Sequence, residues 1–397
     1  MYFSISDIQV KVELKYSREA LRIYYFLRNV AKCLRYVAAG FLKGHLGEST
    51  PCSPFPAIPG YRDLCNFTDL TPFGSPWYCG KPRKLGLTCT DWQMIRDMEF
   101  IEPLPLSSAE TRLVAQLGQP PQIRAIPSLI GVKALRGTPK LPTRPCARQN
   151  FSSTWKLDKP RGYFLHRKWF RTDCRQSTHT PLTDMACLTN TTIIFAGDSN
   201  IMNWFHLLET RLHCRLILDH GHTWHKRRSC VKEDINFHMT WTLHGFPNHP
   251  VSDHWAPRSD FKDVTEQING VPSNGRTVVV VHLFVHYSIH HYSVLHRKME
   301  GIRRATIALL ERNPEAVVVI KGPHTAVAKQ WSAIHLSDMA GQLMREIIHR
   351  VFKDLHSRVL YLDYWDMTIA AENPTVHPQD FVNMAMLDVF LDHICHI

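Results

Sequence analysis

The sequence predicts two domains, an all-β domain followed by an α/β domain with a parallel sheet. The chain has 397 residues, which is more than a single hydrophobic core usually organises. Residues 49–145 are dense in proline, cysteine, glycine and aromatic residues, a composition typical of short cross-linked strands and turns. Beyond residue 161, apolar strand-like runs alternate with segments of helical period, which indicates a parallel sheet covered on both faces.

The first elements and the linker follow from local patterns. Residues 8–14 alternate polar and apolar side chains, as a half-exposed strand does. Residues 19–43 carry apolar groups at helical spacing with interleaved basic residues. We expect an amphipathic segment on a domain surface there, with a membrane-surface helix as the less favoured alternative. Residues 140–161 contain several prolines and little apolar periodicity, which predicts a linker.

The second domain is predicted from its alternating elements. Apolar strands are expected at residues 191–196, 239–243, 277–284, 316–320 and 359–362. Helices are expected at residues 201–212, 302–312 and 340–355. Because ligand sites in such sheets lie beyond the carboxyl ends of the strands, residues that directly follow a strand are the candidates for chemistry.

Gly197, Asp198 and Ser199 form the most informative motif, because they end an apolar strand and precede a helix. Such a turn places a small hydroxyl beside the backbone N–H groups of a helix start, which suits a nucleophile. The alternative is an ordinary helix start with Asp198 or Ser199 as its N-cap.

A serine nucleophile requires a base and a group that orients the base, and residues after the last predicted strand supply both types. Asp363 and Asp366 follow that strand closely, and His377 comes after them. The order serine, acid, histidine predicts acyl transfer, and the combined positions of the three residues carry this interpretation.

Acyl transfer also requires donors for the oxyanion of the intermediate. The backbone N–H of Ser199 is one candidate, and Gly245, just after a predicted strand, is another because glycine allows close backbone approach. Gly197, Asp198 and His286 are further candidates for oxyanion or substrate binding. The histidines around His286 raise a metal hypothesis, but no carboxylate or thiolate completes a recognisable spacing, so we expect no metal.

Composition bounds the compartment and the partners. The net charge of +12 favours an anionic partner, although no long basic block is present. No uncharged apolar stretch is long enough for a membrane span. The 11 cysteines lack a paired C-x-x-C arrangement, and Asn66, Asn150 and Asn190 each begin an Asn-x-Ser/Thr triplet. Together they indicate an oxidising compartment, and the odd cysteine count leaves at least one thiol without a partner in this chain.

Motifs in both halves resemble the neurexophilin and PC-esterase domain (NXPE) family, and the resemblance covers nearly the whole chain. In the first half the motifs are Gly60-Tyr61-Arg62-Asp63, Cys65-Asn66-Phe67-Thr68, residues 76–85 and Cys89-Thr90-Asp91-Trp92. In the second half they are residues 195–199, 365–370, Val376-His377-Pro378 and residues 391–395.

The resemblance implies an immunoglobulin-like β-sandwich over residues 1–147, which is neurexophilin-like and truncated here. It implies a three-layer α/β/α SGNH-hydrolase-like (PC-esterase) domain over residues 148–397. It also implies a secreted or luminal protein, with a signal segment missing from this sequence because the chain opens inside the first domain. Carried over, Ser199 is the nucleophile, His377 the base, and an acid near Asp366 its orienter.

Two departures from the family pattern bear on this expectation. Phe284 and Val285 stand before His286 where the family usually has glycine and glutamine, so a bulky ring is expected near the pocket. The wider SGNH pattern has its acid three positions before the histidine, where this chain has Pro374. Asp366 is therefore the acid we expect, with Asp363 in reserve.

The leading hypothesis is an SGNH-type O-acyltransferase or esterase that acts on glycoconjugates, with acidic sugars such as sialic acids favoured by the basic charge. Relatives in the wider group attach or remove acetyl groups on glycans. The resemblance therefore implies acetyl-CoA as an acyl donor and no bound cofactor. It also implies a glycan or glycoprotein, rather than a nucleic acid, as the partner. The alternative is a secreted binding protein with a catalytically silent PC-esterase domain, which Phe284 and Val285 favour.

Overall fold

The computed structural model describes most of the second predicted domain and part of the first. The described residues are 37–53, 56–68, 76–97, 142–218, 227–245, 255–258, 262–288, 292–325, 338–373 and 375–395. The strand expected at residues 8–14 lies outside them, as do His290 and His291.

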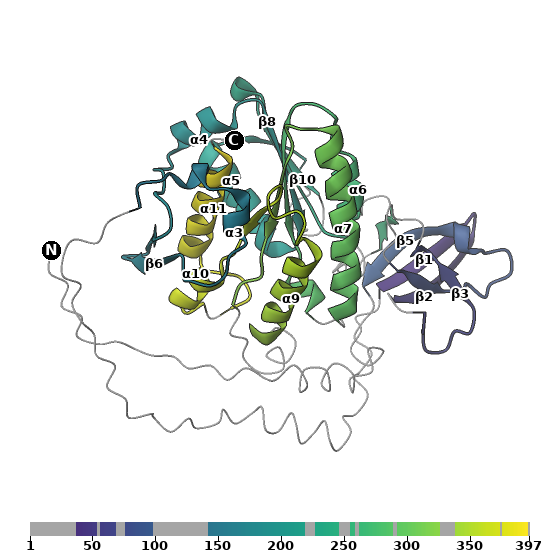
Figure 1. Ribbon diagram of the computed structural model, residues 1–397. Coiled ribbons are helices and arrows are strands. Elements are labelled where there is room, and N and C mark those ends of the chain that lie inside the picture. The colour runs from purple at the N-terminus through teal and green to yellow at the C-terminus, as the bar shows by residue number, and fades with distance from the viewer. Residues whose placement is uncertain are drawn as a thin grey trace, which may run out of the picture.

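The N-terminal part forms one six-stranded sheet in the order β12-β5-β1-β2-β4-β3, with all neighbours antiparallel (Figure 1). The strands are β1 (Val37–Lys43), β2 (Leu46–Ser53), β3 (Leu64–Asn66), β4 (Tyr78–Gly80), β5 (Trp92–Asp97) and β12 (Ala256–Pro257). A short 3-10 helix, η3 (Cys89–Asp91), precedes β5. This sheet agrees with an all-β first domain, and the immunoglobulin-like sandwich stays a prediction.

The prediction of a helical segment at residues 19–43 is wrong for the part that the structure describes, since residues 37–43 form strand β1. Val37, Ala39 and Phe41 are completely buried on one side of the sheet. Because β1 pairs with β2 on one edge and β5 on the other, tertiary pairing outweighs the helical spacing of its apolar residues.

Aromatic packing and two disulfides hold this small sheet together. The rings of Phe67 and Trp92 lie 4.5 Å apart, centroid to centroid, inside the cluster that contains Phe41. The disulfides are Cys52–Cys79, which joins directly paired residues of β2 and β4, and Cys65–Cys89. A small core of this kind benefits from covalent cross-links.

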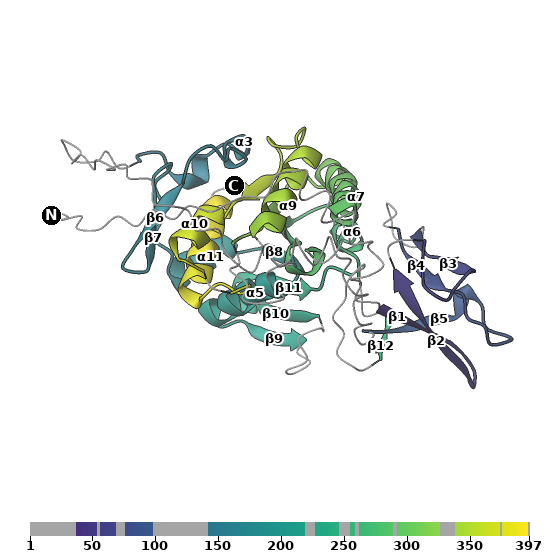
Figure 2. The same cartoon turned by 90° about the horizontal axis from the view of Figure 1, so that it is seen from below.

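One edge strand of the first sheet comes from the second half of the chain. Ala256 in β12 pairs with Ile95 of β5, and Figure 2 shows β12 beside β5 and β1. Trp255 directly precedes β12, and its ring centre lies 4.8 Å from the guanidinium of Arg96. The guanidinium of Arg258 lies 4.4 Å from the ring centre of Trp92. These contacts attach the first sheet to the α/β domain.

The second sheet has seven strands in the order β15-β14-β13-β8-β11-β10-β9. The strands are β8 (Thr191–Gly197), β9 (Arg215–Leu218), β10 (Arg228–Lys232), β11 (Phe237–Thr242), β13 (Arg276–His282), β14 (Val317–Lys321) and β15 (Leu360–Leu362). Strands β15, β14, β13, β8 and β11 run parallel, whereas at one edge β10 pairs antiparallel with β11 and β9 pairs antiparallel with β10. All five predicted strands of this domain are confirmed, and the two edge strands were not predicted.

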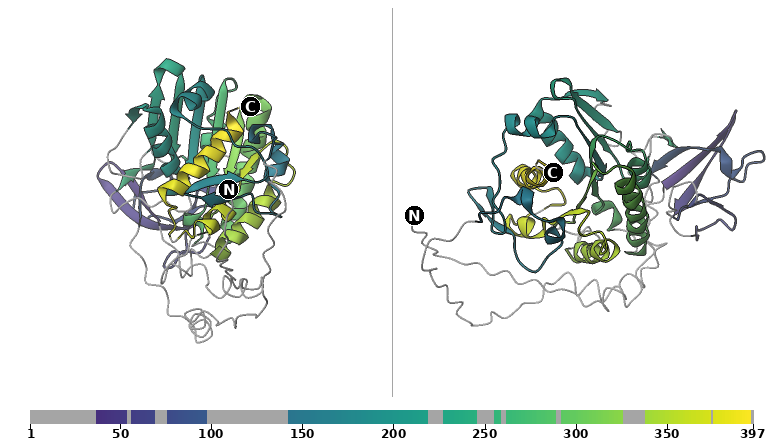
Figure 3. Two further views of the ribbon diagram at one scale, coloured as in Figure 1. Left: turned by 90° about the vertical axis from the view of Figure 1, so that its left-hand side faces the viewer. Right: turned by 45° about the horizontal axis from the view of Figure 1, so that its top comes forward.

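Helices cover both faces of this sheet, so the α/β/α layering is confirmed (Figures 1 and 3). One face carries α4 (Pro181–Leu188), α5 (Ser199–Leu212) and α11 (Asp380–Ile394). The other carries α6 (Val264–Asn269), α7 (Tyr292–Arg312) and α9 (Asp338–Val351). Alternate residues of β8 enter opposite cores: Ile193 and Phe195 pack with α5 and α11, and Ala196 packs in the cluster that contains α6, α7 and α9 residues.

The smaller elements lie around these layers. They are the helices α3 (Phe151–Thr154) and α10 (Trp365–Ala370), the strands β6 (Gly162–Leu165) and β7 (Lys168–Arg171), and the 3-10 helices η4 (Cys146–Arg148), η5 (Glu233–Ile235) and η7 (Val285–Tyr287). The linker expected at residues 140–161 is wrong for its described part, because that segment packs on the α/β domain. Trp155 is buried and donates from Nε1 to the carbonyl of Val359 at 2.8 Å.

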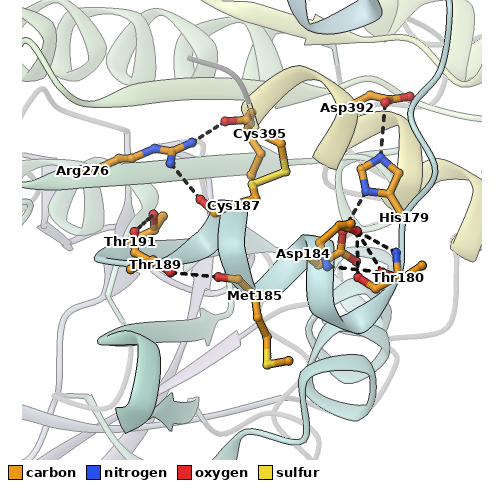
Figure 4. Close-up of a disulfide and its surroundings, with 12 residues drawn as sticks. His179, Thr180, Asp184, Met185, Cys187, Thr189, Thr191, Arg276, Asp392 and Cys395 are labelled. Carbon is orange, nitrogen blue, oxygen red and sulfur yellow. Dashed lines mark hydrogen bonds and ion pairs between the residues drawn. A yellow bond between two sulfur atoms is a disulfide. The ribbon is translucent and has the colours of Figure 1, made fainter.

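Helices α4 and α11 are tied together covalently and by a buried ion-pair cluster (Figure 4). The disulfide Cys187–Cys395 joins their C-terminal ends. His179 lies between two carboxylates, with Nδ1 2.8 Å from Asp184 Oδ1 and Nε2 3.3 Å from Asp392 Oδ1. Burial alone would lower the pKa of His179, but the hydrogen bonds to Asp184 and Asp392 outweigh it and raise that pKa to about 9.

Candidate active site

Ser199 and His377 meet at the carboxyl end of the central strand β8. Gly197 ends β8, Asp198 is the N-cap of α5, and Ser199 is the first residue of that helix. Ser199 Oγ lies 2.7 Å from Nε2 of His377, although the two residues are 178 positions apart in the chain. Ser199 is nearly buried, whereas the imidazole of His377 is exposed in the loop before α11. The separation is that of a serine hydroxyl and a base within proton-transfer reach.

The Gly197–Asp198 turn is locked by close packing and by two hydrogen bonds. A Cβ atom at position 197 would lie 2.2 Å from the carbonyl oxygen of His282, so only glycine fits here. Asp198 accepts from the backbone N–H of Asn200 at 2.9 Å and of Val285 at 3.1 Å. The first bond caps α5, and the second ties the loop after β13 to the turn that presents Ser199.

A buried chain of polar groups lies beneath this turn. The N–H at Nδ1 of His282 donates to the carbonyl of Lys321 at 2.9 Å, and Lys321 Nζ lies 3.4 Å from Nε2 of the same ring. Nε2 of His282 is 3.7 Å from Asp198 Oδ1. All three side chains are buried, so any charge that one of them carries acts strongly on the other two at low dielectric.

These neighbours set the protonation of the buried groups. Burial would raise the pKa of Asp198, but His282, His286 and Lys321 outweigh it and hold that pKa well below its ordinary value. Burial, aided by Lys321, lowers the pKa of His282 to about 4. Burial, opposed by Asp198, lowers the pKa of Lys321 to about 7. Asp198 therefore stays ionised as the helix cap at neutral pH, and His282 stays neutral.

The two carboxylates predicted to orient His377 are engaged elsewhere. Asp366 accepts from the backbone N–H of Arg161 at 2.6 Å and of Met367 at 2.8 Å. Asp363 forms an ion pair with Arg345 at 2.6 Å. No carboxylate of the described residues contacts the His377 ring, so the structure does not support the orienting role expected of Asp366. The reason is geometric, because Asp366 lies in the first turn of α10 and Asp363 lies just before that helix, where backbone N–H groups and Arg345 engage their carboxylates.

The predicted oxyanion and substrate residues lie near the turn. Gly245 has φ of +70°, and a Cβ there would meet Asp263 Cα at 3.0 Å, so this position also requires glycine. The preceding His244 donates from Nδ1 to the Gly245 carbonyl at 2.8 Å, and its Nε2 lies 2.8 Å from Nδ1 of His286. This pair links the loops after β11 and β13, and the oxyanion role of Gly245 stays a prediction.

Phe284 does not narrow the candidate pocket. Its side chain is buried, and its ring packs edge-on against His324 with centroids 5.0 Å apart. Val285 contributes the backbone N–H that Asp198 accepts. The expectation that a bulky ring reaches the pocket is therefore wrong, because the side chain turns into the core that covers the other face of the sheet.

An open pocket of about 560 Å³ extends from the Ser199–His377 pair along α5. It is lined by Ser199, Met202, Asn203, His206, Leu207, Thr210, His377, Pro378, Asp380 and Asn383. The α5 residues in this set recur at helical spacing on the face opposite Trp204 and Leu208, which are buried in the core. Ser199 and His377 are the two predicted site residues in this lining, since Gly197 and Asp198 lie beneath the serine.

Three further polar residues near the pair were missed in the sequence. Lys321 ends β14, His324 follows it, and Asn383 lies in the first turn of α11. The position of Lys321 and His324 after a predicted apolar strand was a usable signal, the same one that identified Ser199. Asn383 lies in a helix that was not predicted, so no comparable signal marked it.

The described histidines of the cluster considered for a metal each have a different partner. His282 bonds to Lys321, His286 to His244, and His296 lies 3.7 Å from Glu300 on α7. Within the described ranges, no three histidine, cysteine or acidic side chains converge to hold a metal ion.

Several solved structures share a distant likeness to the chain. A protein described as a GDSL-like lipase from Parabacteroides merdae matches with 11% identity and a TM-score of 0.32, over 52% of this chain and 96% of its own. The acetylxylan esterase Axe2 from Geobacillus stearothermophilus matches with 12% identity and a TM-score of 0.29, over 51% of this chain and 93% of its own. These similarities are too low to inform on activity.

The family comparison is more decisive. Residues 169–395 match the family model described as NXPE family member 4-like, C-terminal domain. The match covers the second sheet from β8 to β15 and the Ser199–His377 pair. Because the matched residues make up more than half of the chain, the protein belongs to the NXPE family.

Proposed function

We propose that this protein is a serine-dependent O-acyltransferase or esterase that acts on acyl groups of glycoconjugates. The observation that carries the proposal is the 2.7 Å separation between Ser199 Oγ and His377 Nε2. A serine hydroxyl becomes a competent nucleophile when a base within hydrogen-bond reach takes its proton. The pair opens into a pocket large enough for a substrate, about 560 Å³ in volume.

The first half of the reaction forms an acyl-serine. Ser199 Oγ bonds to the acyl carbonyl carbon of the donor while its proton passes to His377 Nε2. The tetrahedral intermediate then expels the donor's alkoxide or thiolate, which takes the proton from His377. The backbone N–H of Ser199 at the start of α5, together with that of Gly245, is proposed to stabilise the oxyanion.

The second half transfers the acyl group to a hydroxyl. His377 removes the proton of the acceptor, which is water for an esterase and a sugar hydroxyl for a transferase. The acceptor oxygen attacks the acyl carbon, and Ser199 leaves and regains its proton from His377. Acetyl-CoA is the proposed donor for the transferase, since its thiolate is a good leaving group.

The pocket lining supports a hydroxyl-rich substrate. Asn203, His206 and Thr210 present polar groups along α5. Asn383 also belongs to the lining, and its Nδ2 donates to the carbonyl of Pro378 at 2.7 Å. Among the described residues, the lining includes Asp380 but no lysine or arginine. We therefore expect neutral sugar hydroxyls in this pocket, with the acid group of any acidic sugar held outside it.

A secreted or luminal location fits the covalent structure. The described residues form five disulfides, which persist in oxidising compartments. Asn66, Asn150 and Asn190 are all exposed, as glycosylation acceptors must be. No described helix has the length and hydrophobicity needed to cross a membrane. Glycosylation at these three positions is part of the proposal.

Hydrolysis of an aryl acetate by the purified protein tests the proposal. Ser199→Ala is expected to lower kcat/KM about a hundredfold or more, because it removes the nucleophile. The matched control is Ser273→Ala, an exposed serine before β13, which is expected to leave the rate unchanged. Equal rates for wild type and Ser199→Ala would contradict the enzyme proposal and favour the binding-protein alternative.

Release of CoA from acetyl-CoA distinguishes transferase from esterase. The assay compares a neutral sugar, an acidic sugar and no acceptor. A transferase is expected to release CoA faster when an acceptor is present, whereas an esterase releases it at the same rate without one. Release that Ser199→Ala leaves unchanged would exclude Ser199 from either reaction.

A further inference from the structure

The loop that carries His377 is held through its main chain at four consecutive positions. Each carbonyl of residues 375–378 accepts one hydrogen bond from a side chain. The donor and acceptor pairs are Asn373 Nδ2 to Thr375 at 2.7 Å, His324 Nε2 to Val376 at 3.0 Å, Thr375 Oγ1 to His377 at 2.6 Å, and Asn383 Nδ2 to Pro378 at 2.7 Å. We refer to His324, Asn373 and Asn383 with these carbonyls as the 375–378 clamp.

The three main donors of the clamp are buried and come from separate parts of the fold. His324 follows β14, Asn373 follows α10, and Asn383 belongs to α11, and none of them is more than 2% exposed. Asn373 Nδ2 also donates to the carbonyl of Thr325 at 2.8 Å, which joins the His377 loop to the residue next to His324. Buried hydrogen bonds of this kind are costly to break, so the loop has one defined path.

His324 is the central member and has one defined tautomer. A carbonyl oxygen can only accept, so Nε2 of His324 carries the proton that bonds to Val376. Burial, together with Lys321 and His282, keeps the pKa of His324 well below its ordinary value. The ring therefore stays neutral at physiological pH and keeps this donor in place.

In a serine triad, a carboxylate orients the imidazole so that Nε2 faces the serine. No described carboxylate contacts His377, because Asp366 is bonded to the backbone N–H groups at positions 161 and 367 and Asp363 is paired with Arg345. Nε2 of His377 nevertheless lies 2.7 Å from Ser199 Oγ. The orientation must therefore come from the path of the loop itself.

We propose that the site is a Ser199–His377 dyad in which the 375–378 clamp, with His324 as its central positioning residue, takes over the orienting task that a carboxylate has in a triad. This inference rests on the proposed function and specifies how its base is held. Displacing the imidazole by about 1 Å is enough to slow such a reaction about a hundredfold.

Aryl acetate kinetics over a range of pH test the dyad with four variants. His324→Leu removes the donor and is expected to lower kcat about 10- to 100-fold with KM nearly unchanged, since the pocket lining stays intact. His324→Gln keeps an amide donor of similar reach and is expected to recover most of the lost kcat. Asp366→Asn is expected to keep both kcat and the pH profile of wild type. Asn373→Asp, which exchanges a donor for an acceptor of equal size, is expected to resemble His324→Leu and serves if that variant does not fold.

The outcomes separate this inference from the proposed function. A loss of about a thousandfold or more in Asp366→Asn would show that this carboxylate completes a triad and would overturn the dyad. Full activity in folded His324→Leu and Asn373→Asp would overturn the clamp. If Ser199→Ala keeps wild-type activity, the proposed function fails and the clamp with it. Loss of activity in Ser199→Ala together with wild-type rates in Asp366→Asn and slow His324→Leu supports both.

Discussion

The disulfide Cys187–Cys395 is expected to contribute more to the stability of the α/β domain than a shorter cross-link in the same domain. It joins the end of α4 to the end of α11 across a sequence separation of 208 (Figure 4). Cys214–Cys230 spans a separation of only 16. Arg276 reinforces the longer link, since it donates to the carbonyl of Cys187 at 2.9 Å and to that of Ile394.

The expected magnitudes follow from the entropy of loop closure in the unfolded chain. The separation of 208 corresponds to about 5 kcal/mol of the free energy of unfolding at 25 °C, and the separation of 16 to about 3 kcal/mol. The double variant Cys187→Ala/Cys395→Ala should therefore lose about 2 kcal/mol more than Cys214→Ala/Cys230→Ala. The second variant is the matched control, because it also removes two sulfur atoms from this domain.

Urea unfolding under non-reducing conditions, followed by tryptophan fluorescence, measures both losses. We expect a lower midpoint for the Cys187/Cys395 variant, with similar slopes for the two proteins. Equal losses, or a larger loss when the short loop is opened, would refute the argument from loop closure. Such a result would mean that local packing around the sulfur atoms decides the stability.

Three further predictions follow from single contacts. Gly197→Ala places a Cβ 2.2 Å from the carbonyl oxygen of His282, so β8 must shift. We expect kcat for aryl acetate to fall at least about tenfold, and wild-type kinetics would contradict this. His179 has a folded pKa of about 9, above its unfolded value, so its stabilisation is complete below the unfolded value and is lost as the pH rises through about 9. The difference in unfolding free energy between wild type and His179→Gln should therefore shrink by about 2 kcal/mol from pH 6 to pH 10. A difference that stays constant with pH would show that folding does not raise the pKa of His179. Trp255→Ala removes the ring under Arg96, and limited proteolysis should then cleave the N-terminal sheet faster while aryl acetate activity stays unchanged; unaltered cleavage would show that β12 does not depend on this contact.

The parallel sheet could be predicted because each strand is a short apolar run buried on both faces. In β8, Ile193 and Ile194 enter opposite cores, so no polar alternation obscures the pattern. Strand β1 could not be predicted in the same way, since Ala38, Ala39 and Leu42 also suit a helix. Its pairing with the neighbouring strand β2 and with β5, which is distant in the sequence, decides its conformation.

The site could be predicted as far as local motifs reach. Ser199 follows a strand and starts a helix, and His377 follows the last strand, so both lie at the same edge of the sheet. The choice of Asp366 failed because sequence order does not show where a side chain points. The contact of His324 with Val376 joins loops 52 positions apart, which no local pattern reveals.

The linker prediction failed for a related physical reason. Prolines in residues 140–161 favour an irregular path, but an irregular path can still be packed. Trp155 stacks on His356 with ring centroids 4.1 Å apart, and Cys146 is bonded to Cys174. Two large aromatic residues in a proline-rich stretch, Phe151 and Trp155, were the signal that this segment belongs to a core.

Peptide mapping after reaction with a fluorophosphonate tests most directly whether Ser199 and His377 act as a nucleophile and its base. The reagent modifies a serine hydroxyl that a neighbouring base activates, and Ser199 Oγ lies 2.7 Å from His377 Nε2. The account predicts the adduct on Ser199 in the wild-type protein and its loss in His377→Ala. An unlabelled Ser199, or equal labelling with and without the imidazole, would contradict it.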